Sequence, residues 1–164
     1  IAYKAEKINT HGGSLRIYVK KNLKTKIDKS IKSLLNEEEK FGIKKYQTYQ
    51  NFAKEVYKIR DSVRKNILKL KENGTKIIGY GSPAKATTAL NFFGISDEIE
   101  CIVEDNKLKQ GKLLPGVKIP IVSKSEIKNK PDFALVLAWN FINEIKSKNV
   151  DLAHKFISIK DLEN

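Results

Sequence analysis

The chain has 164 residues, enough for one hydrophobic core with a helical appendage, and 40% of its residues are hydrophobic. No apolar run reaches the length of a transmembrane helix and no signal peptide is visible, so we expect a soluble, cytoplasmic protein with no membrane partner. The single cysteine, Cys101, excludes an internal disulfide and a cysteine-cluster metal site, and we expect no metal site in this chain.

The formal net charge of +13 is unevenly distributed. Residues 1–73 carry 19 Lys and Arg against 8 Asp and Glu, whereas residues 74–164 carry 13 against 11. Only three of the basic residues are arginine, the residue that dominates bidentate recognition of phosphates and bases. We therefore expect no nucleic-acid partner, since a lysine-rich surface alone is weak evidence for one.

The chain begins with a predicted strand segment. Residues 1–19 are typical of one or two short strands, in which apolar Leu15, Ile17 and Val19 alternate with other residues. A His-Gly-Gly-Ser loop that starts at His11 interrupts them. Histidine is suited to proton transfer near neutral pH, although a lone histidine in a loop is more often a solvated surface residue.

Two amphipathic helices are predicted next. Apolar residues recur at steps of three and four over residues 24–39 and again over residues 46–72. The sequence contains no methionine and opens directly on strand-like residues, so we expect a piece of a longer protein.

From residue 75 short apolar runs alternate with helical patterns. Strands are predicted over 76–80, 99–103, 117–122, 133–138 and 155–159, and helical segments over 84–93, 123–129 and 141–148. This alternation predicts an α/β, Rossmann-like fold, a doubly wound and mostly parallel sheet with helices on both faces. The predicted organisation is a strand segment at 1–22 on the edge of a preceding domain, a helical connector at 23–74 and the Rossmann-like domain at 75–164.

A Gly-rich turn after the first strand of that domain is a candidate anion site. Gly79, Gly81 and Ala84 match the G-x-G-x-x-G/A spacing, in which Gly79 permits a tight turn and Gly81 lets a ligand approach the backbone. Ser82 adds a hydroxyl group, and Pro83 fits the first helical position. The N-terminus of the following helix favours an anion. The alternative is a tight strand-to-helix turn that binds nothing.

Residues after two later strands also carry side chains suited to ligands. Glu104 and Asp105 follow the second strand, where dinucleotide-binding folds place an acid that binds ribose hydroxyls, although acids are common at strand ends. Trp139 and Asn140 follow the strand at 133–138 and could stack on a ring and bind an amide or hydroxyl group. The alternative is that Trp139 covers the core and Asn140 caps the next helix.

Four segments of the sequence together resemble one enzyme family. They are HGGSLR at 11–16, GYGSPAKATTALNF at 79–92, VEDN and KQGKLLPG within 103–116, and LAWNFINEI at 137–145. In this order they resemble the C-terminal domain of S-adenosylmethionine-dependent C-methyltransferases that act on nucleotide-linked deoxysugars. The resemblance covers nearly the whole chain and implies a Rossmann-like domain that binds a dTDP-linked sugar. It places the methyl donor, S-adenosylmethionine, in a separate domain of the same polypeptide, and zinc only in an N-terminal domain.

The resemblance also implies roles for individual residues. His11 is the implied general base, which removes a proton next to a keto group of the sugar so that this carbon can be methylated. The implied substrate-binding residues are Gly79, Tyr80, Gly81, Ser82, Pro83, Ala84, Lys85, Thr87, Asp105, Asn106, Trp139 and Asn140. Gly81, Ser82 and Lys85 are expected near the diphosphate. The chain alone is expected to be inactive, because the methyl donor is bound elsewhere.

Two other functions remain open at the level of sequence. The Gly-rich turn and the acids after the second strand also suit a stand-alone NAD- or nucleotide-binding module. The lysine-rich helices leave a basic nucleic-acid-binding domain as a weaker alternative.

Overall fold

The computed structural model describes residues 1–22, 24–72 and 74–163. Two compact units can be separated by their internal contacts, Ile1–Glu55 and Val56–Asn164. Asn73, which falls within the predicted helical connector, lies outside the described residues. The predicted division at residues 22 and 74 stays a prediction, and the two units are described separately below.

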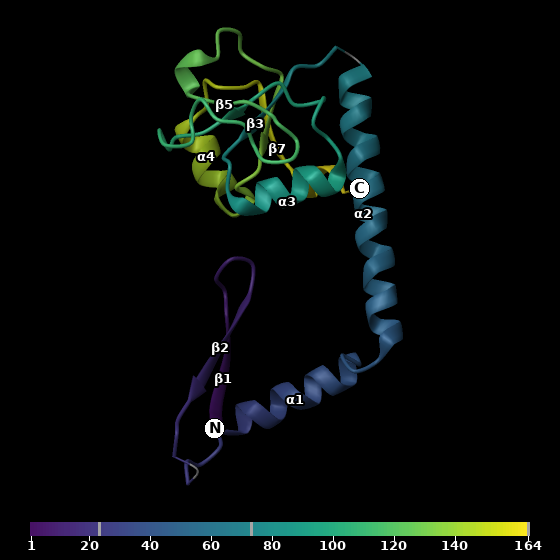
Figure 1. The fold of residues 1–164 in the computed structure, drawn as a ribbon, viewed down its shortest axis with the longest axis vertical. Coiled ribbons are helices and arrows are strands. Elements are labelled where there is room, and N and C mark those ends of the chain that lie inside the picture. The colour runs from purple at the N-terminus through teal and green to yellow at the C-terminus, as the bar shows by residue number, and fades with distance from the viewer. Residues whose placement is uncertain (23, 73, 164) are drawn as a thin grey trace. The chain divides into compact units, whose positions relative to one another are not determined.

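The first unit contains a β-hairpin. Strands β1 (Ala2–Ile8) and β2 (Ser14–Val19) pair antiparallel, which confirms the two predicted strands (Figure 1). The loop between them is a tight turn, because the N–H of Gly13 donates to the carbonyl oxygen of Thr10 over 2.9 Å. His11 and Gly12 at its centre have positive φ angles of 52° and 88°. Positive φ at both central residues is typical of the turns that suit the twist of a hairpin.

Helix α1 (Lys29–Phe41) follows the hairpin and is attached to it. The N–H of Ala5 in β1 donates to the Ser30 hydroxyl over 3.1 Å, and the N–H of Asp28 donates to the carbonyl oxygen of Tyr3. The helix begins later than the predicted residue 24, because the Asp28 carboxylate accepts from the N–H of Ser30 and so acts as its N-cap.

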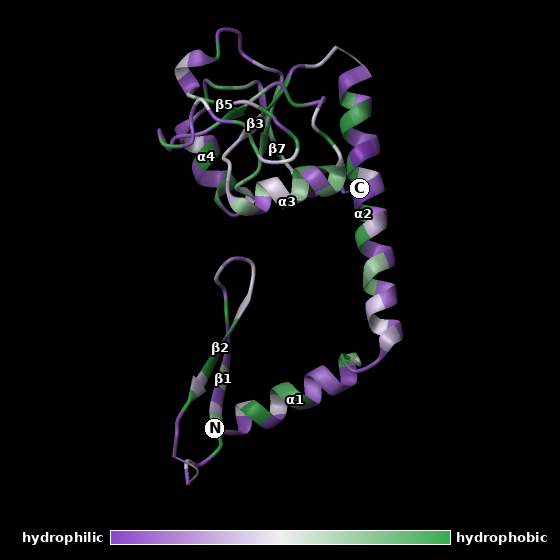
Figure 2. Cartoon of the chain, viewed as in Figure 1, coloured by the Kyte–Doolittle hydropathy of each residue, from purple (hydrophilic) through white to green (hydrophobic). Residues whose placement is uncertain are grey.

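Helix α2 (Tyr46–Glu72) has the predicted bounds and belongs partly to each unit. Hydrophilic and hydrophobic residues alternate along it (Figure 2). In the second unit its Val63 and Ile67 are fully buried in the main hydrophobic cluster. The core of the second unit therefore includes residues of α2, which precede the domain start predicted at residue 75.

The second unit is built on a five-stranded parallel sheet, as predicted. Its strands are β3 (Ile77–Tyr80), β4 (Ile102–Val103), β5 (Ile121–Val122), β6 (Phe133–Val136) and β7 (Lys155–Ser158). Their order is β5-β4-β3-β6-β7, and every pairing is parallel. Helix α3 (Ala84–Phe93) connects β3 to β4, and α4 (Ile142–Lys148) connects β6 to β7 (Figure 1). The middle strand β3 is buried along its whole length.

Alternate residues of β3 face two separate hydrophobic clusters, one on each side of the sheet. Ile77 belongs to the cluster that contains Leu90 of α3 and Ile67 of α2. Ile78 belongs to the cluster against which Ile145 of α4 packs. Since strand side chains alternate between faces, these clusters lie on opposite faces, and the prediction of helices on both faces is confirmed.

Three short 3-10 turns complete the described part of the second unit. The helical segment predicted at 123–129, of one or two turns, is a single turn, Lys124–Glu126. A turn at Trp139–Phe141 precedes α4, so the helix starts at Ile142 without Asn140 as its N-cap. A last turn, Ile159–Leu162, follows β7. Within the described ranges, none of the helices combines the length and apolar character needed to cross a bilayer.

Candidate functional site

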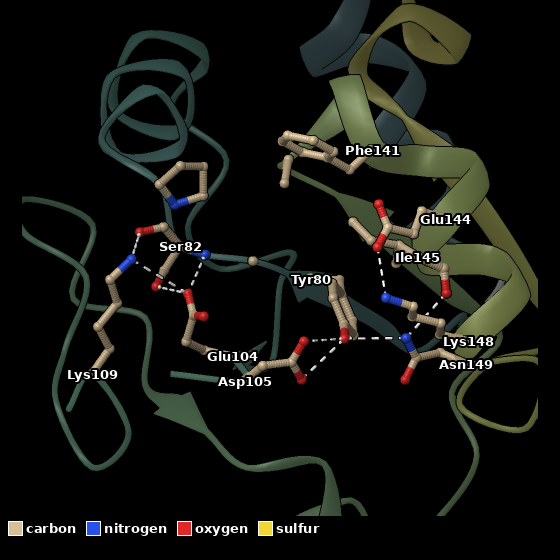
Figure 3. A pocket seen from close by; sticks show the side chains of 13 residues that line it. Tyr80, Ser82, Glu104, Asp105, Lys109, Phe141, Glu144, Ile145, Lys148 and Asn149 are labelled. Carbon is tan, nitrogen blue, oxygen red and sulfur yellow. Dashed lines mark hydrogen bonds and ion pairs between the residues drawn. The ribbon is translucent and has the colours of Figure 1, made fainter. Parts of the chain in front are cut away.

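The cavity of interest lies at the carboxyl edge of the parallel sheet. The chain leaves β3 toward β4 on one side and reaches β6 on the other side by a later crossover, so β3 and β6 meet at a topological switch point. Open α/β sheets bind ligands in the crevice at such a point. A cavity of about 620 Å³ lies here (Figure 3). Its walls are Tyr80, Gly81, Ser82, Pro83, Glu104, Asp105, Lys109, Ala138, Phe141, Glu144, Ile145, Lys148 and Asn149.

The two glycines of the predicted motif have roles other than those expected. Gly79 lies inside β3 and is buried, and a Cβ atom there would come within 2.9 Å of the Ile102 side chain. It permits close packing of neighbouring side chains rather than a turn. Gly81 makes the turn, with φ of +82°, and a Cβ there would lie 3.2 Å from the Cβ of Ala138.

The backbone donors of the turn are used within the protein. The N–H of Gly81 donates to the carbonyl oxygen of Val103 over 2.8 Å. The N–H and the hydroxyl of Ser82 both donate to Oε2 of Glu104, over 2.9 and 2.5 Å. Pro83 has no N–H and is the N-cap of α3 rather than its first residue. The turn thus differs from a phosphate-binding loop, in which these N–H groups point at the ligand.

Glu104 is held in its ionised form by this arrangement. Its Oε1 accepts from the N–H of Asn106 over 3.0 Å, and Nζ of Lys109 lies 3.5 Å from its Oε2. Burial by itself raises the pKa of this carboxyl, but the hydrogen bonds from Ser82 and Asn106 and the charge of Lys109 outweigh it, and the pKa is lowered. Lys109 also donates to the carbonyl oxygen of Ser82 over 2.9 Å, so it contacts both Ser82 and Glu104.

A second polar cluster joins three elements on the other side of the cavity. The Tyr80 hydroxyl lies 2.9 and 3.1 Å from the two oxygens of Asp105, and Nδ2 of Asn149 donates to that hydroxyl over 3.1 Å (Figure 3). Burial, followed by the hydrogen bond to Asp105, raises the pKa of Tyr80 to about 12. Tyr80 is therefore a neutral donor at physiological pH, and the Asp105 carboxylate keeps further lone pairs for a ligand.

Helix α4 and the turn before it supply the remaining wall. Phe141 is 55% exposed and offers a flat apolar surface, with Ile145 one helical turn further on. Lys148 forms an ion pair with Glu144 over 2.6 Å at the rim. These residues combine an apolar surface with polar groups, which is the usual composition of a small-molecule site.

Seven of the predicted substrate residues do not line the cavity, namely Gly79 and the six that follow. Ala84, Lys85 and Thr87 lie in α3, Asn106 follows Asp105, and Trp139 and Asn140 lie in the turn before α4. Trp139 packs against the main core cluster, and Nζ of Lys85 lies 4.0 Å from the centre of its ring. Asn140 is exposed. Tyr80, Gly81, Ser82, Pro83 and Asp105 are the predicted residues that do line it.

Several cavity residues were absent from the implied substrate-binding residues. Glu104 was a candidate only as a ribose-binding acid beside Asp105, and the others are Lys109, Ala138, Phe141, Glu144, Ile145, Lys148 and Asn149. Phe141, Ile145 and Asn149 repeat at a step of four, so a helical face next to the strand end at 133–138 was a signal that could have identified them. Lys109 carries no comparable signal, because only the folded loop brings it to Ser82.

His11 lies in the first unit, in the hairpin turn, with its side chain exposed. Ser14 closes this turn by donating to the carbonyl oxygen of Thr10 over 3.0 Å. Among the residues that the structure describes, no three His, Cys, Asp or Glu side chains are grouped so that they could hold a metal ion.

The lowered pKa of Glu104 predicts a pH-dependent contribution to stability. A carboxyl whose pKa is lowered by folding stabilises the protein above its unfolded pKa, near 4.5, and loses that contribution as the pH falls through the folded value. We expect Glu104→Gln to lower the free energy of unfolding by about 1 kcal/mol at pH 7, and by less at pH 3.5. Urea unfolding at both pH values measures this, and a cost that does not shrink in acid would contradict it. Glu144→Gln, at an exposed ion pair, is the control and should have a smaller effect at pH 7.

Comparison with known proteins places these features in a family. The family model described as "C-methyltransferase C-terminal domain" matches residues 9–158, a range that includes His11, the turn and the cavity. The chain is also 33% identical over 140 residues to the C-methyltransferase NovU of Streptomyces niveus. That match covers 84% of this chain and 33% of the relative, so the chain spans about one third of the relative's length. The chain belongs to the C-methyltransferase C-terminal domain family.

Proposed function

We propose that this chain is the nucleotide-sugar-binding, C-terminal part of an S-adenosylmethionine-dependent C-methyltransferase. In this proposal the enzyme methylates a carbon next to a keto group of a dTDP-linked deoxysugar, and the sugar nucleotide binds in the cavity at the carboxyl edge of the sheet. Membership in the C-methyltransferase C-terminal domain family supports the proposal that the chain is part of a C-methyltransferase. The observation that carries the binding role is the cavity at the switch point, with Asp105 at the end of the second strand.

The side chains around the cavity suit a neutral, hydroxyl-rich ligand. The Asp105 carboxylate accepts hydrogen bonds and is held in place by the Tyr80 hydroxyl, which in turn accepts from Asn149. Phe141 offers an exposed ring on the opposite wall, against which a sugar or base can pack. An oriented acceptor opposite an apolar surface is the arrangement by which small-molecule sites fix both position and specificity.

His11 is proposed as the general base. An exposed imidazole can take the proton from the carbon next to the keto group, which leaves an enolate with a nucleophilic carbon. The hairpin turn presents this imidazole at its tip.

The methyl donor is assigned to a separate domain of the same polypeptide. S-adenosylmethionine supplies an electrophilic methyl group when it is bound there. The Gly81–Ser82 turn does not suit a cofactor that needs free N–H donors, because both N–H groups are bonded within the protein. These internal hydrogen bonds also argue against an NAD-binding module, because the pyrophosphate of NAD needs free N–H donors at this turn. Zinc is proposed only for an N-terminal domain outside this chain, and nucleic acid and membranes are not proposed as partners.

Binding of dTDP-glucose by the 15N-labelled chain tests the proposal. We expect amide shifts at residues 80–83, 104–109 and 141–149, and Asp105→Asn should weaken binding about tenfold because it removes a charged acceptor. Asp97→Asn is the matched control, since it makes the same change at an exposed acid outside the cavity and should leave affinity unaltered. Absence of shifts at millimolar dTDP-glucose would count against the proposed function, as would equal effects of the two variants.

A further inference from the structure

We infer that Glu104 is a specificity-determining residue that keeps phosphate away from the Gly81–Ser82 turn. On this inference, which rests on the proposed function, the cavity takes an uncharged, hydroxyl-bearing ring of the sugar nucleotide. The diphosphate then lies outside the turn. The inference departs from the expectation that Gly81 and Ser82 contact the diphosphate.

The first argument is that the position of an anion at the turn is already filled. Oε2 of Glu104 accepts from both the N–H and the hydroxyl of Ser82, over 2.9 and 2.5 Å. A phosphate oxygen at such a turn takes the same two donors. A phosphate that replaced Glu104 would leave this carboxylate, whose side chain is only 13% exposed, without its two hydrogen bonds from Ser82.

The second argument is that two further donors beside the turn, the N–H of Gly81 and Nζ of Lys109, are also committed. The N–H of Gly81 donates to Val103, and Pro83 has none. Nζ of Lys109 donates to the carbonyl oxygen of Ser82 and lies 3.5 Å from Oε2 of Glu104. The ammonium group of Lys109 beside the turn is thus paired with the same carboxylate.

The third argument is the charge of the whole cavity. Its walls carry three carboxylates, Glu104, Asp105 and Glu144, against the ammonium groups of Lys109 and Lys148. A net negative cavity repels a diphosphate, whereas carboxylates with spare lone pairs accept hydrogen bonds from hydroxyl groups. Phe141 adds a surface for a ring on the other wall.

Pyrophosphate binding by the 15N-labelled chain at pH 7.5 tests the role of Glu104. We expect the wild-type Ser82 amide to respond weakly, and Glu104→Gln to raise the affinity for pyrophosphate at least about fivefold, because it removes the competing charge. Glu144→Gln makes the same charge change in the same cavity without touching the turn, and should raise the affinity less. Strong saturable binding of pyrophosphate at Ser82 in the wild type, or equal affinity in wild type and Glu104→Gln, would overturn the inference.

A comparison on the wild-type chain keeps the inference testable if Glu104→Gln does not fold. Thymidine and dTDP should bind within about fivefold of each other at 150 mM salt, since a diphosphate outside the turn would meet only weak, screened contacts with exposed charges. A much tighter dTDP complex with a large shift at Ser82 would overturn the inference. If dTDP-glucose shifts residues around Asp105 and thymidine does not, the ring in the cavity is the hexose, which supports the inference. If dTDP-glucose binds with Ser82 as its main contact, the proposed function stands and this inference fails.

Discussion

In the full-length polypeptide, replacing His11 by asparagine is expected to lower kcat by about 10²- to 10⁴-fold while leaving the affinity for the sugar nucleotide nearly unaltered. The loss follows from the proposed role of the imidazole as the base that removes the proton next to the keto group. Asparagine has no group that can accept this proton near neutral pH.

Asparagine is the right substitution because of the backbone at this position. His11 has φ of +52°, and asparagine adopts this left-handed region more readily than most residues. The variant therefore removes the imidazole without disturbing the hairpin turn. Methyl transfer under saturating substrate measures kcat, and a direct binding assay measures affinity.

The chain offers a matched control for this experiment. His154, the other of its two histidines, is exposed and precedes β7 in the second unit. His154→Asn makes the same chemical change and should leave kcat unaltered. Full activity of His11→Asn, or an equal loss in both variants, would contradict the role of His11 as the base.

The second large effect is expected at Gly79, where valine should lower the free energy of unfolding by about 3 kcal/mol. A Cβ at this position would lie 2.9 Å from Cγ1 of Ile102 and 3.1 Å from Cδ1 of Leu137. Both neighbours are fully buried, so neither side chain can move aside into solvent. Urea unfolding of the variant measures the cost.

A double substitution separates crowding from other causes. Ile102→Ala removes the atom nearest to the added side chain and should itself cost about 3 kcal/mol. If crowding is the cause, Gly79→Val and Ile102→Ala together should cost less than the sum of the single variants by more than about 1 kcal/mol. Strictly additive costs would show that Gly79 is required for a reason other than space.

Local patterns were enough to predict most of the fold. The apolar run at Ile77–Tyr80, the small residues after it and the helical spacing that follows are all encoded within 20 residues of one another. The strand order β5-β4-β3-β6-β7 was not predicted, because right-handed crossovers and buried parallel strands are compatible with more than one order. Element ends were less predictable, because caps such as Asp28 decide them through individual hydrogen bonds.

The cavity was predictable only in part. Asp105 could be located because acids at the end of the second strand have a known meaning in this fold. The helical spacing of Asn149 could have indicated the face that it shares with Phe141, but its hydrogen bond to the Tyr80 hydroxyl could not be predicted, since the two residues are 69 positions apart. The role of Glu104 was equally hidden, because its spacing from the turn suits both a ligand contact and the internal hydrogen bonds that it makes.

The hydrogen bonds between Glu104 and Ser82 have a consequence for the thermodynamics of recognition. Many phosphate-binding loops have free backbone donors and become ordered when their anion binds. The loop then loses conformational entropy, and this loss lowers the affinity. Here the carboxylate orders the turn from within, and Lys109 holds it from the outer side. The rim of the cavity is therefore preorganised, and a ligand that enters beside it can bind without the entropic cost of shaping the turn.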